Sequence, residues 1–309
     1  MLKQRMTALA AALMVPAALA LTAPATGQQK ITIGVSLAQD DNPFYIAMLR
    51  GVRARAQELG WDVATVSANE DKLKQINGVQ DLVARGVNGI LISPIDAVGV
   101  NAAYDAAAAA KIPIVSVARG SASPNQTIHV AMDEKQIGRD IAEWTRRKLG
   151  GKGKVALLMG PSGAPTFKNL GDGYTEVMAK HPSIQIVFRG DGPLTRERGV
   201  KQAEDALVAH PDLAAIYTAN DDVALGAMQA VLAANKQTIV TGMNGVPPAL
   251  RAVKDGKLAM TIELNPVEWG RLGVDVLATY FKGDKVEPRV FIKHVIIDKT
   301  NIDEKLPRT

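Results

Sequence analysis

Residues 31–60 read ITIGVSLAQDDNPFYIAMLRGVRARAQELG and divide into three segments. The run 31–37 is apolar and rich in β-branched residues, as expected for a parallel strand that is buried on both faces. From residue 44 onward, apolar residues recur at helical spacing until Gly60, a typical helix C-cap signal. Asn42 is a good N-cap, and Pro43 suits the first helical position. The stretch therefore predicts a strand, a polar loop and a capped helix.

The loop at residues 40–45 carries polar and aromatic side chains where the predicted strand ends. In open α/β sheets the ligand crevice lies at the carboxyl ends of the strands, so we interpret this loop as a binding loop. In the alternative interpretation, Asn42 only caps the helix and Phe44 only packs. The residues of the loop leave both interpretations open.

The first 25 residues have the composition of a secretory signal peptide. Lys3 and Arg5 precede an apolar run at 8–21, and 23–25 is a small-x-small cleavage motif. A membrane anchor is disfavoured because the run is short and rich in alanine. The chain has no cysteine, which excludes disulfides, a catalytic thiol and a lipid-modified cysteine. We expect a soluble protein, cleaved near Ala25 and exported to the periplasm.

Charge and length restrict the function and the domain organisation. Without residues 1–25 the chain has 34 basic and 31 acidic residues, a formal charge of +3, which is too small to favour nucleic-acid binding. The remaining length of about 280 residues exceeds a comfortable single core. Two lobes are therefore expected.

Strand and helix patterns alternate almost without interruption after residue 30. The first set of strands is expected at 31–37, 62–67, 89–93, 112–117 and 127–131, with helices near 43–59, 71–85, 97–110 and 134–149. The second set of strands is expected at 154–159, 184–189, 214–218, 238–242 and 258–262, with helices near 166–180, 196–209, 222–234, 246–255 and 267–281. This alternation predicts an α/β protein with two Rossmann-like lobes, each a parallel sheet flanked by helices.

Several short motifs occur in a fixed order along the chain. They are NPFY at 42–45, QDLVARG at 80–86 followed by GILISP at 89–94, AHPD at 209–212, TANDDVALGA at 218–227 and VKDGKL at 253–258. With the signal peptide and the doubled α/β pattern, the chain resembles the periplasmic sugar-binding proteins of ABC transporters, of the ribose- and galactose-binding type. The resemblance covers essentially the whole chain after the signal peptide.

The resemblance implies two lobes joined by a hinge of three crossings, with the ligand held between them. The first lobe would contain 30–132 plus 265–291, and the second 133–264 plus 294–309. The ligand-binding residues implied by the resemblance, or lying beside its positions, are Ser36, Asn42, Phe44, Tyr45, Arg119, Asn220 and Asn244. Amide and guanidinium groups can satisfy several sugar hydroxyls at once, and an aromatic face can cover the C–H side of the ligand.

Five positions depart from the pentose- and hexose-binding pattern. They are Ala118, Leu170, Leu194, Asn244 and Leu264. These departures argue against ribose or galactose and favour an acyclic polyol, a deoxy or otherwise modified sugar, or a small cyclic polyol. Two residues are inserted in the first loop, which places Gln39, Asp40 and Asp41 where they could replace the carboxylate lost at position 118. Phe167 and Glu263 are candidates for the other vacated roles.

Other chemistry-bearing residues have simpler interpretations. The histidines are His129, His181, His210 and His294, and their spacing does not fit a metal site. We interpret Asp221 as the N-cap of a helix that starts at Val223, and Trp269 as a packing residue that could also reach the ligand. No metal, cofactor or catalytic residue is expected.

These observations favour a solute receptor that captures a small sugar or polyol and passes it to an inner-membrane ABC permease. The protein is expected to act as a monomer and not to bind nucleic acid. The alternative is a periplasmic sensor component that presents its ligand to a chemoreceptor or a sensor kinase. An exported enzyme is disfavoured because the crevice loops show no convincing nucleophile, acid/base pair or metal site.

Overall fold

The computed structural model describes residues 30–162 and 164–305. The predicted signal peptide, 1–25, lies outside the described residues. Among the described helices, none has both the length and the hydropathy needed to cross a membrane.

The first sheet has six strands in the order β11-β5-β4-β3-β1-β2, and all neighbouring pairs are parallel. Its strands are β1 (Thr32–Leu37), β2 (Asp62–Ser67), β3 (Gly89–Ile92), β4 (Ile114–Val117), β5 (Ile128–Ala131) and β11 (Arg289–Phe291). The buried, β-branched runs predicted from the sequence form the central strands β1, β3 and β4.

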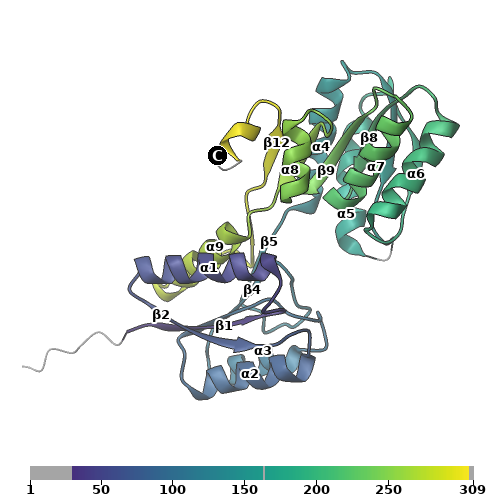
Figure 1. Ribbon diagram of the computed structural model, residues 1–309. Coiled ribbons are helices and arrows are strands. Elements are labelled where there is room, and N and C mark those ends of the chain that lie inside the picture. The colour runs from purple at the N-terminus through teal and green to yellow at the C-terminus, as the bar shows by residue number, and fades with distance from the viewer. Residues whose placement is uncertain (1–29, 163, 306–309) are drawn as a thin grey trace, which may run out of the picture. The chain divides into compact units, whose positions relative to one another are not determined.

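Two helices cover each face of this sheet (Figure 1). They are α1 (Pro43–Glu58) and α9 (Pro266–Phe281) on one face, and α2 (Lys72–Ala84) and α3 (Asn101–Ala109) on the other. Each helix pair encloses its own buried apolar cluster with the sheet. The helices lie on the two faces of the sheet, and the loops follow the carboxyl ends of the strands at one edge.

The second sheet also has six strands, in the order β12-β10-β9-β8-β6-β7. Its strands are β6 (Gly153–Leu158), β7 (Ile184–Gly190), β8 (Leu213–Thr218), β9 (Ile239–Asn244), β10 (Met260–Glu263) and β12 (Val295–Asp298). The five strands predicted from the sequence, β6 to β10, are parallel to one another, and the last strand, β12, pairs antiparallel with β10 at the edge.

Helices also cover both faces of the second sheet. One apolar cluster includes residues of α4 (Glu134–Lys148) and α5 (Pro165–Met178). The other includes residues of α6 (Arg196–Ala209), α7 (Asp221–Ala233), α8 (Pro247–Lys254) and the short 3₁₀ helix η1 (Ile302–Glu304). The expected α/β architecture with two helix-flanked sheets is therefore confirmed.

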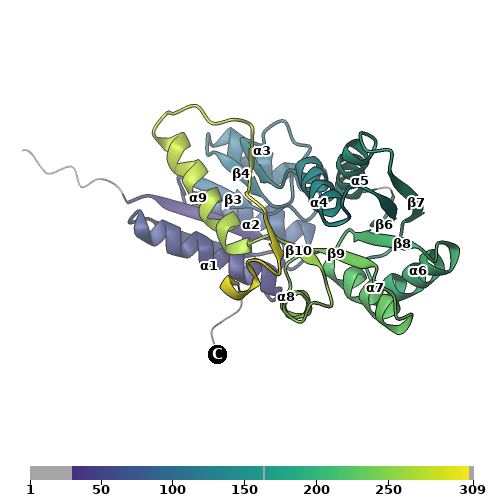
Figure 2. The same cartoon turned by 90° about the horizontal axis from the view of Figure 1, so that it is seen from above.

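Helix α1 packs directly against α9, and glycines make this close approach possible (Figures 1 and 2). A Cβ atom on Gly51 would lie 2.0 Å from the Val267 carbonyl oxygen, and one on Gly270 would lie 2.1 Å from the Met48 carbonyl oxygen. Both distances are far below van der Waals contact. The pair fixes α1, and with it the loop that precedes the helix.

The chain passes between the two sheets three times. The connections are β5 to α4 at 131–134, β10 to α9 at 263–266, and β11 to β12 at 291–295. This agrees with the hinge of three crossings expected from the resemblance.

Candidate ligand-binding site

A cavity with a volume of about 1320 Å³ is lined by loops at the carboxyl ends of strands from both sheets. Five of the seven predicted ligand-binding residues line it, and they are Phe44, Tyr45, Arg119, Asn220 and Asn244. They follow β1, β4, β8 and β9 or end them. This is the location that open α/β sheets favour for a ligand.

Ser36 does not line this cavity. Its side chain is completely buried, and its hydroxyl accepts a 3.4 Å hydrogen bond from Gln75 Nε2. The same nitrogen donates to the Ser93 carbonyl oxygen, and the Ser93 hydroxyl donates to Tyr45 Oη at 3.3 Å. Ser36 thus belongs to a buried chain of hydrogen bonds that ends on a cavity residue.

Asn42 also lies outside the cavity lining. Its Oδ1 accepts a hydrogen bond from the Phe44 backbone N–H at 2.9 Å, so the prediction that it caps α1 is confirmed. Its Nδ2 donates to Gln39 Oε1 at 2.8 Å. Both ends of the amide are used within the loop, and the residue shapes the loop that presents Phe44 and Tyr45.

Aromatic rings form the part of the cavity that belongs to the first sheet. The Phe44 ring lies edge-on to Tyr45 at 5.3 Å and to Trp269 at 5.6 Å between centroids. Trp269 is 3% exposed, and its indole N–H donates to the Val130 carbonyl oxygen at 3.3 Å. Trp269 therefore packs, as predicted, and also lines the cavity.

Arg119 lies beside these rings, with its guanidinium carbon 5.8 Å from the Tyr45 ring centroid. Its Nη2 is 3.1 Å from Glu70 Oε1. Glu70 lies on the β2–α2 loop, whereas Gln39, Asp40 and Asp41, the candidates to replace the carboxylate lost at position 118, do not line this cavity. No hydrogen bond or ion pair joins Arg119 to those three residues in the described part of the chain.

The turn that presents Arg119 is held by His129, which the sequence analysis did not connect with the ligand. Ala118 adopts φ of 61°, a left-handed conformation that costs about 1–3 kcal/mol for a residue other than glycine. His129 Nε2 lies 3.3 Å from the Ala118 carbonyl oxygen, and its ring also lines the cavity. Burial lowers the pKa of His129. The neutral imidazole with a proton on Nε2 is therefore the form that holds this turn.

Asparagine side chains from the second sheet line another part of the cavity. Asn220 caps α7, because its Oδ1 accepts from the Val223 N–H at 3.0 Å. The expectation that Asp221 is the cap is therefore wrong. Asn220 Nδ2 has no hydrogen-bond partner among the described residues. Asn244 ends β9 with φ of 124°, a second strained backbone position at the cavity.

Four of the five positions that depart from the sugar-binding pattern line the cavity, and they are Ala118, Leu194, Asn244 and Leu264. The fifth, Leu170, is completely buried on α5. Its carbonyl oxygen would lie 2.1 Å from a Cβ atom on Gly138, so α4 packs directly against it.

Phe167 and Glu263, the two candidates to replace lost ligand contacts, differ in whether they line the cavity. Phe167 lines the cavity. Glu263 does not, and its carboxylate pairs with Lys305 at 2.7 Å. Phe167 thus remains a candidate contact, whereas Glu263 is engaged elsewhere.

The histidines do not gather into a metal site. Over residues 30–162 and 164–305, no group of three His, Asp or Glu side chains is arranged to hold a metal ion. His294 pairs with Asp140 at 2.8 Å, and His210 Nε2 lies 3.1 Å from the Val187 carbonyl oxygen. Their contacts agree with structural roles.

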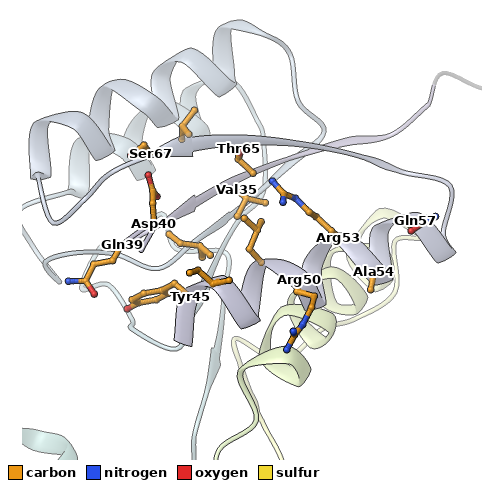
Figure 3. Close-up of a pocket in the computed structure, with 14 residues that line it drawn as sticks. Val35, Gln39, Asp40, Tyr45, Arg50, Arg53, Ala54, Gln57, Thr65 and Ser67 are labelled. Atoms are coloured by element: carbon orange, nitrogen blue, oxygen red, sulfur yellow. The ribbon is translucent and has the colours of Figure 1, made fainter. Parts of the chain in front are cut away.

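A second cavity of about 780 Å³ lies between α1 and β2 and is lined by residues 35–67 alone (Figure 3). Arg50 and Arg53 on α1 and Asp40 on the preceding loop border it, and Tyr45 lines both cavities. This second cavity contains none of the strand-end residues of the second sheet. The larger cavity is therefore the candidate ligand-binding site.

A protein family described as "Periplasmic binding protein domain" matches residues 33–285. The chain is 31% identical over 296 residues to the ribose import binding protein of Haemophilus influenzae, and the match covers 96% of this chain and 100% of that protein.

Two solved structures extend the similarity to the fold. A periplasmic ribose ABC transporter protein from Conexibacter woesei is 29% identical with a TM-score of 0.81, over 89% of this chain and 94% of that one. An ABC transporter solute binding protein from Mycobacterium smegmatis, with bound glycerol, is 34% identical with a TM-score of 0.72, over 91% of this chain and 98% of that one.

Proposed function

This chain belongs to the periplasmic binding protein domain family, and we propose that it captures a small sugar or polyol and delivers it to an ABC permease of the inner membrane. The observation that carries the proposal is the larger cavity, where aromatic rings from one sheet and asparagine amides from the other line the same space. Membership of a family of binding proteins agrees with the prediction that the chain is not an enzyme.

The proposed ligand contacts divide by chemistry. Phe44 and Tyr45 would cover the C–H face of the ligand, because aromatic rings bind apolar faces. Arg119 and the amides of Asn220 and Asn244 would exchange hydrogen bonds with its hydroxyls. Asn220 Nδ2 supports this role because it lacks a partner among the described residues and borders the cavity.

The lining departs from the pentose- and hexose-binding pattern at defined positions. Ala118, Leu194 and Leu264 offer apolar surface at three of the cavity positions where the resemblance implies polar or aromatic contacts. Leaving a buried hydroxyl without a partner costs about 1–3 kcal/mol, so such surface selects against a pyranose or furanose that presents hydroxyls at these positions. We propose an acyclic polyol, a deoxy or modified sugar, or a small cyclic polyol.

We propose that binding involves closure of two lobes, 30–132 plus 265–291 and 133–264 plus 294–309. The cavity volume of about 1320 Å³ exceeds the range of roughly 300–1,000 Å³ that is common for small-molecule sites. A ligand of sugar size would therefore contact both sides only after the lobes approach. Ligand-dependent closure follows when only the closed state offers both sets of contacts.

The proposed location is the periplasm, reached through a signal peptide cleaved near Ala25, and the proposed state is a monomer. The relatives described above are named as import or transporter proteins, which supports a permease as the partner. They do not favour the alternative in which the ligand is presented to a chemoreceptor or a sensor kinase.

A thermal-shift screen of residues 26–309 against ribose, galactose, fucose, erythritol, xylitol, ribitol and myo-inositol tests the proposal. A ligand present at 100 times its Kd adds about 2.7 kcal/mol of stability, which raises the unfolding midpoint by several degrees. We expect the largest shift from a polyol or from the deoxy sugar fucose. A larger shift with ribose or galactose would overturn the proposed ligand class, and no shift with any compound would overturn sugar and polyol binding.

A further inference from the structure

Asp221 is a buried carboxylate directly behind the cavity that contacts neither solvent nor the cavity. It is the first residue of α7, it is 1% exposed, and it follows Asn220 in the chain. Its Oδ1 accepts from the Thr261 hydroxyl at 2.7 Å, and its Oδ2 accepts from the Val246 backbone N–H at 2.8 Å. One carboxylate thus connects α7, the loop after β9 and strand β10.

The loop that Asp221 holds is strained and lines the cavity. Asn244 has φ of 124°, a strained value for a residue other than glycine, and Gly245 has φ of 70°, which glycine adopts without strain. The Gly245 N–H donates to Thr261 Oγ1 at 3.3 Å, so Thr261 connects this part of the loop to the carboxylate as well. Strained backbone persists only where its surroundings fix it, and here Asp221 and Thr261 supply that support.

The structure also makes room for the carboxylate. A Cβ atom on Gly242 would lie 2.4 Å from Asp221 Oδ1, so no larger residue fits at this position of β9 without displacing Asp221. The position of Asp221 at the start of α7 places its charge where the helix dipole favours an anion.

The charged groups near Asp221 do not neutralise it. Asp222, its neighbour on α7, repels it and pairs with Arg196 of α6 at 3.3 Å. On β10, Glu263 pairs with Lys305. Arg251 and Lys254 lie in the last turn of α8. The other charged residues of α6, which packs against α7, are Glu197, Arg198, Lys201, Glu204 and Asp205.

We propose that Asp221 is a positioning residue for ligand binding, and that its ionised form holds Asn220, Asn244 and the 245–246 loop in the arrangement that meets a hydroxylated ligand. The inference rests on the proposed function only where it concerns the ligand. Two donors, the Val246 N–H and the Thr261 O–H, point at the group. A carboxylate accepts both, whereas a neutral amide offers one acceptor and one donor.

At neutral pH the ionised Asp221 carboxylate makes folding less favourable. This cost distinguishes a residue that positions ligand contacts from one that only stabilises the fold. Burial raises the pKa of Asp221 to about 6, although the hydrogen bonds from Thr261 and Val246 lower it. The folded pKa lies above the unfolded value, so the stability that this group contributes is present at low pH and is lost as pH rises from about 4 to about 6. Replacing Asp221 by a neutral residue of the same shape removes this pH-dependent loss of stability. A residue whose only role was to stabilise the fold would not be expected to cause such a loss.

The test compares Asp221→Asn with the matched control Asp222→Asn, which removes a neighbouring exposed carboxylate. We expect Asp221→Asn to unfold at pH 7.5 at a midpoint no lower than that of the wild type, and to lose at least tenfold protection against hydrogen exchange at the Gly245 and Val246 amides. Its affinity for xylitol or ribose, whichever binds by calorimetry, should fall at least tenfold. The control should change protection and affinity less than twofold.

Measuring stability as a function of pH adds a result that a change in packing alone would not alter. The wild type should lose stability relative to Asp221→Asn between pH 4 and pH 6, and the control should follow the wild type. If Asp221→Asn does not fold, Thr261→Val removes one of the two donors and should show a smaller loss of amide protection, about threefold.

Unchanged protection at Gly245 and Val246 in a folded Asp221→Asn variant would overturn the inference. The inference would also be overturned if the affinity of Asp221→Asn fell only in proportion to a loss of its stability. If neither xylitol nor ribose binds the wild type, the exchange experiment still decides the role of Asp221, and the failure then belongs to the proposed function.

Discussion

The two sides of the larger cavity are built on different principles. On the side of the first sheet, the Phe44 ring packs against the Tyr45 and Trp269 rings at 5.3 and 5.6 Å between centroids, and Tyr45 and Trp269 each make one further hydrogen bond. On the side of the second sheet, Asn220 accepts a hydrogen bond from the Val223 N–H, and the buried Asp221 carboxylate holds the loop after Asn244 through the Val246 N–H. The comparison indicates that the first side supplies contact area and the second side supplies directional recognition.

The ionisable groups buried behind the two sides also differ. Burial lowers the pKa of His129, so this group stays neutral and holds the Ala118 turn through one hydrogen bond. Burial raises the pKa of Asp221, so its ionised form is held at an energetic cost. The two sides are therefore expected to respond in opposite directions to pH.

The largest effect is expected from Trp269→Ala on the aromatic side. The side chain is 3% exposed and contacts Phe44, and truncating a buried aromatic residue costs about 3–5 kcal/mol. Urea unfolding followed by circular dichroism measures the loss. The control Trp269→Phe keeps a ring beside Phe44 and should lose clearly less. A loss below about 1 kcal/mol for Trp269→Ala would show that packing does not hold this side.

Next in size is the effect of Arg119→Ala on affinity. A hydrogen bond to a charged group contributes about 1.5–3 kcal/mol, so binding of the best compound from the screen should weaken roughly 10- to 100-fold. Calorimetry measures the change. Glu70→Gln keeps the guanidinium and removes its partner charge, so it should weaken binding less. Equal losses for both variants would indicate that the ion pair, not Arg119 alone, recognises the ligand.

A smaller effect is expected from Gly242→Ala on the hydrogen-bonded side. The added methyl group would lie 2.4 Å from Asp221 Oδ1 and 3.1 Å from Ala224 Cβ, and such overpacking costs about 1–3 kcal/mol. The matched control is Gly171→Ala, inside α5, where the nearest atom lies 3.7 Å away. This control should be neutral or slightly stabilising, because alanine is the better helix former. Urea unfolding of both variants decides the point.

The smallest effect concerns pH and His129. Its folded pKa lies below the unfolded value, so its contribution is present above the unfolded pKa and is lost as pH falls through the folded pKa. The stability of the wild type relative to His129→Gln should therefore fall on acidification. The corresponding difference for Asp221→Asn should change in the opposite direction. If the stability differences of His129→Gln and Asp221→Asn changed in the same direction with pH, the proposed contrast between the two sides of the cavity would be wrong.

The sequence predicted the fold and most of the cavity for identifiable reasons. Buried β-branched runs and glycine-terminated helices fix the alternation, and the strand-end rule for α/β sheets identifies the loop at Phe44. The resemblance to periplasmic sugar-binding proteins supplied Arg119, Asn220 and Asn244. The Asn42 cap was also predicted, because its signal is local.

The remaining features depend on contacts between segments that are distant in sequence. Glu70 reaches Arg119 from another loop and lies in a left-handed turn with φ of 55°, which no local pattern indicates. Leu170 is buried because Gly138 lets α4 approach it. Asp221 and Asn220 are adjacent and both suit an N-cap, so their roles separate only once Thr261 and Val246 are placed beside them.

The most direct test of the account is a calorimetric titration of residues 26–309 with xylitol and with ribose, repeated for Phe44→Ala and Asn220→Ala. The account predicts one ligand per chain, tighter binding of xylitol than of ribose, a negative heat-capacity change from buried apolar surface, and at least tenfold weaker binding in each variant. Tighter binding of ribose, or binding that either variant leaves unchanged, would contradict a ligand held jointly by the aromatic and the amide sides.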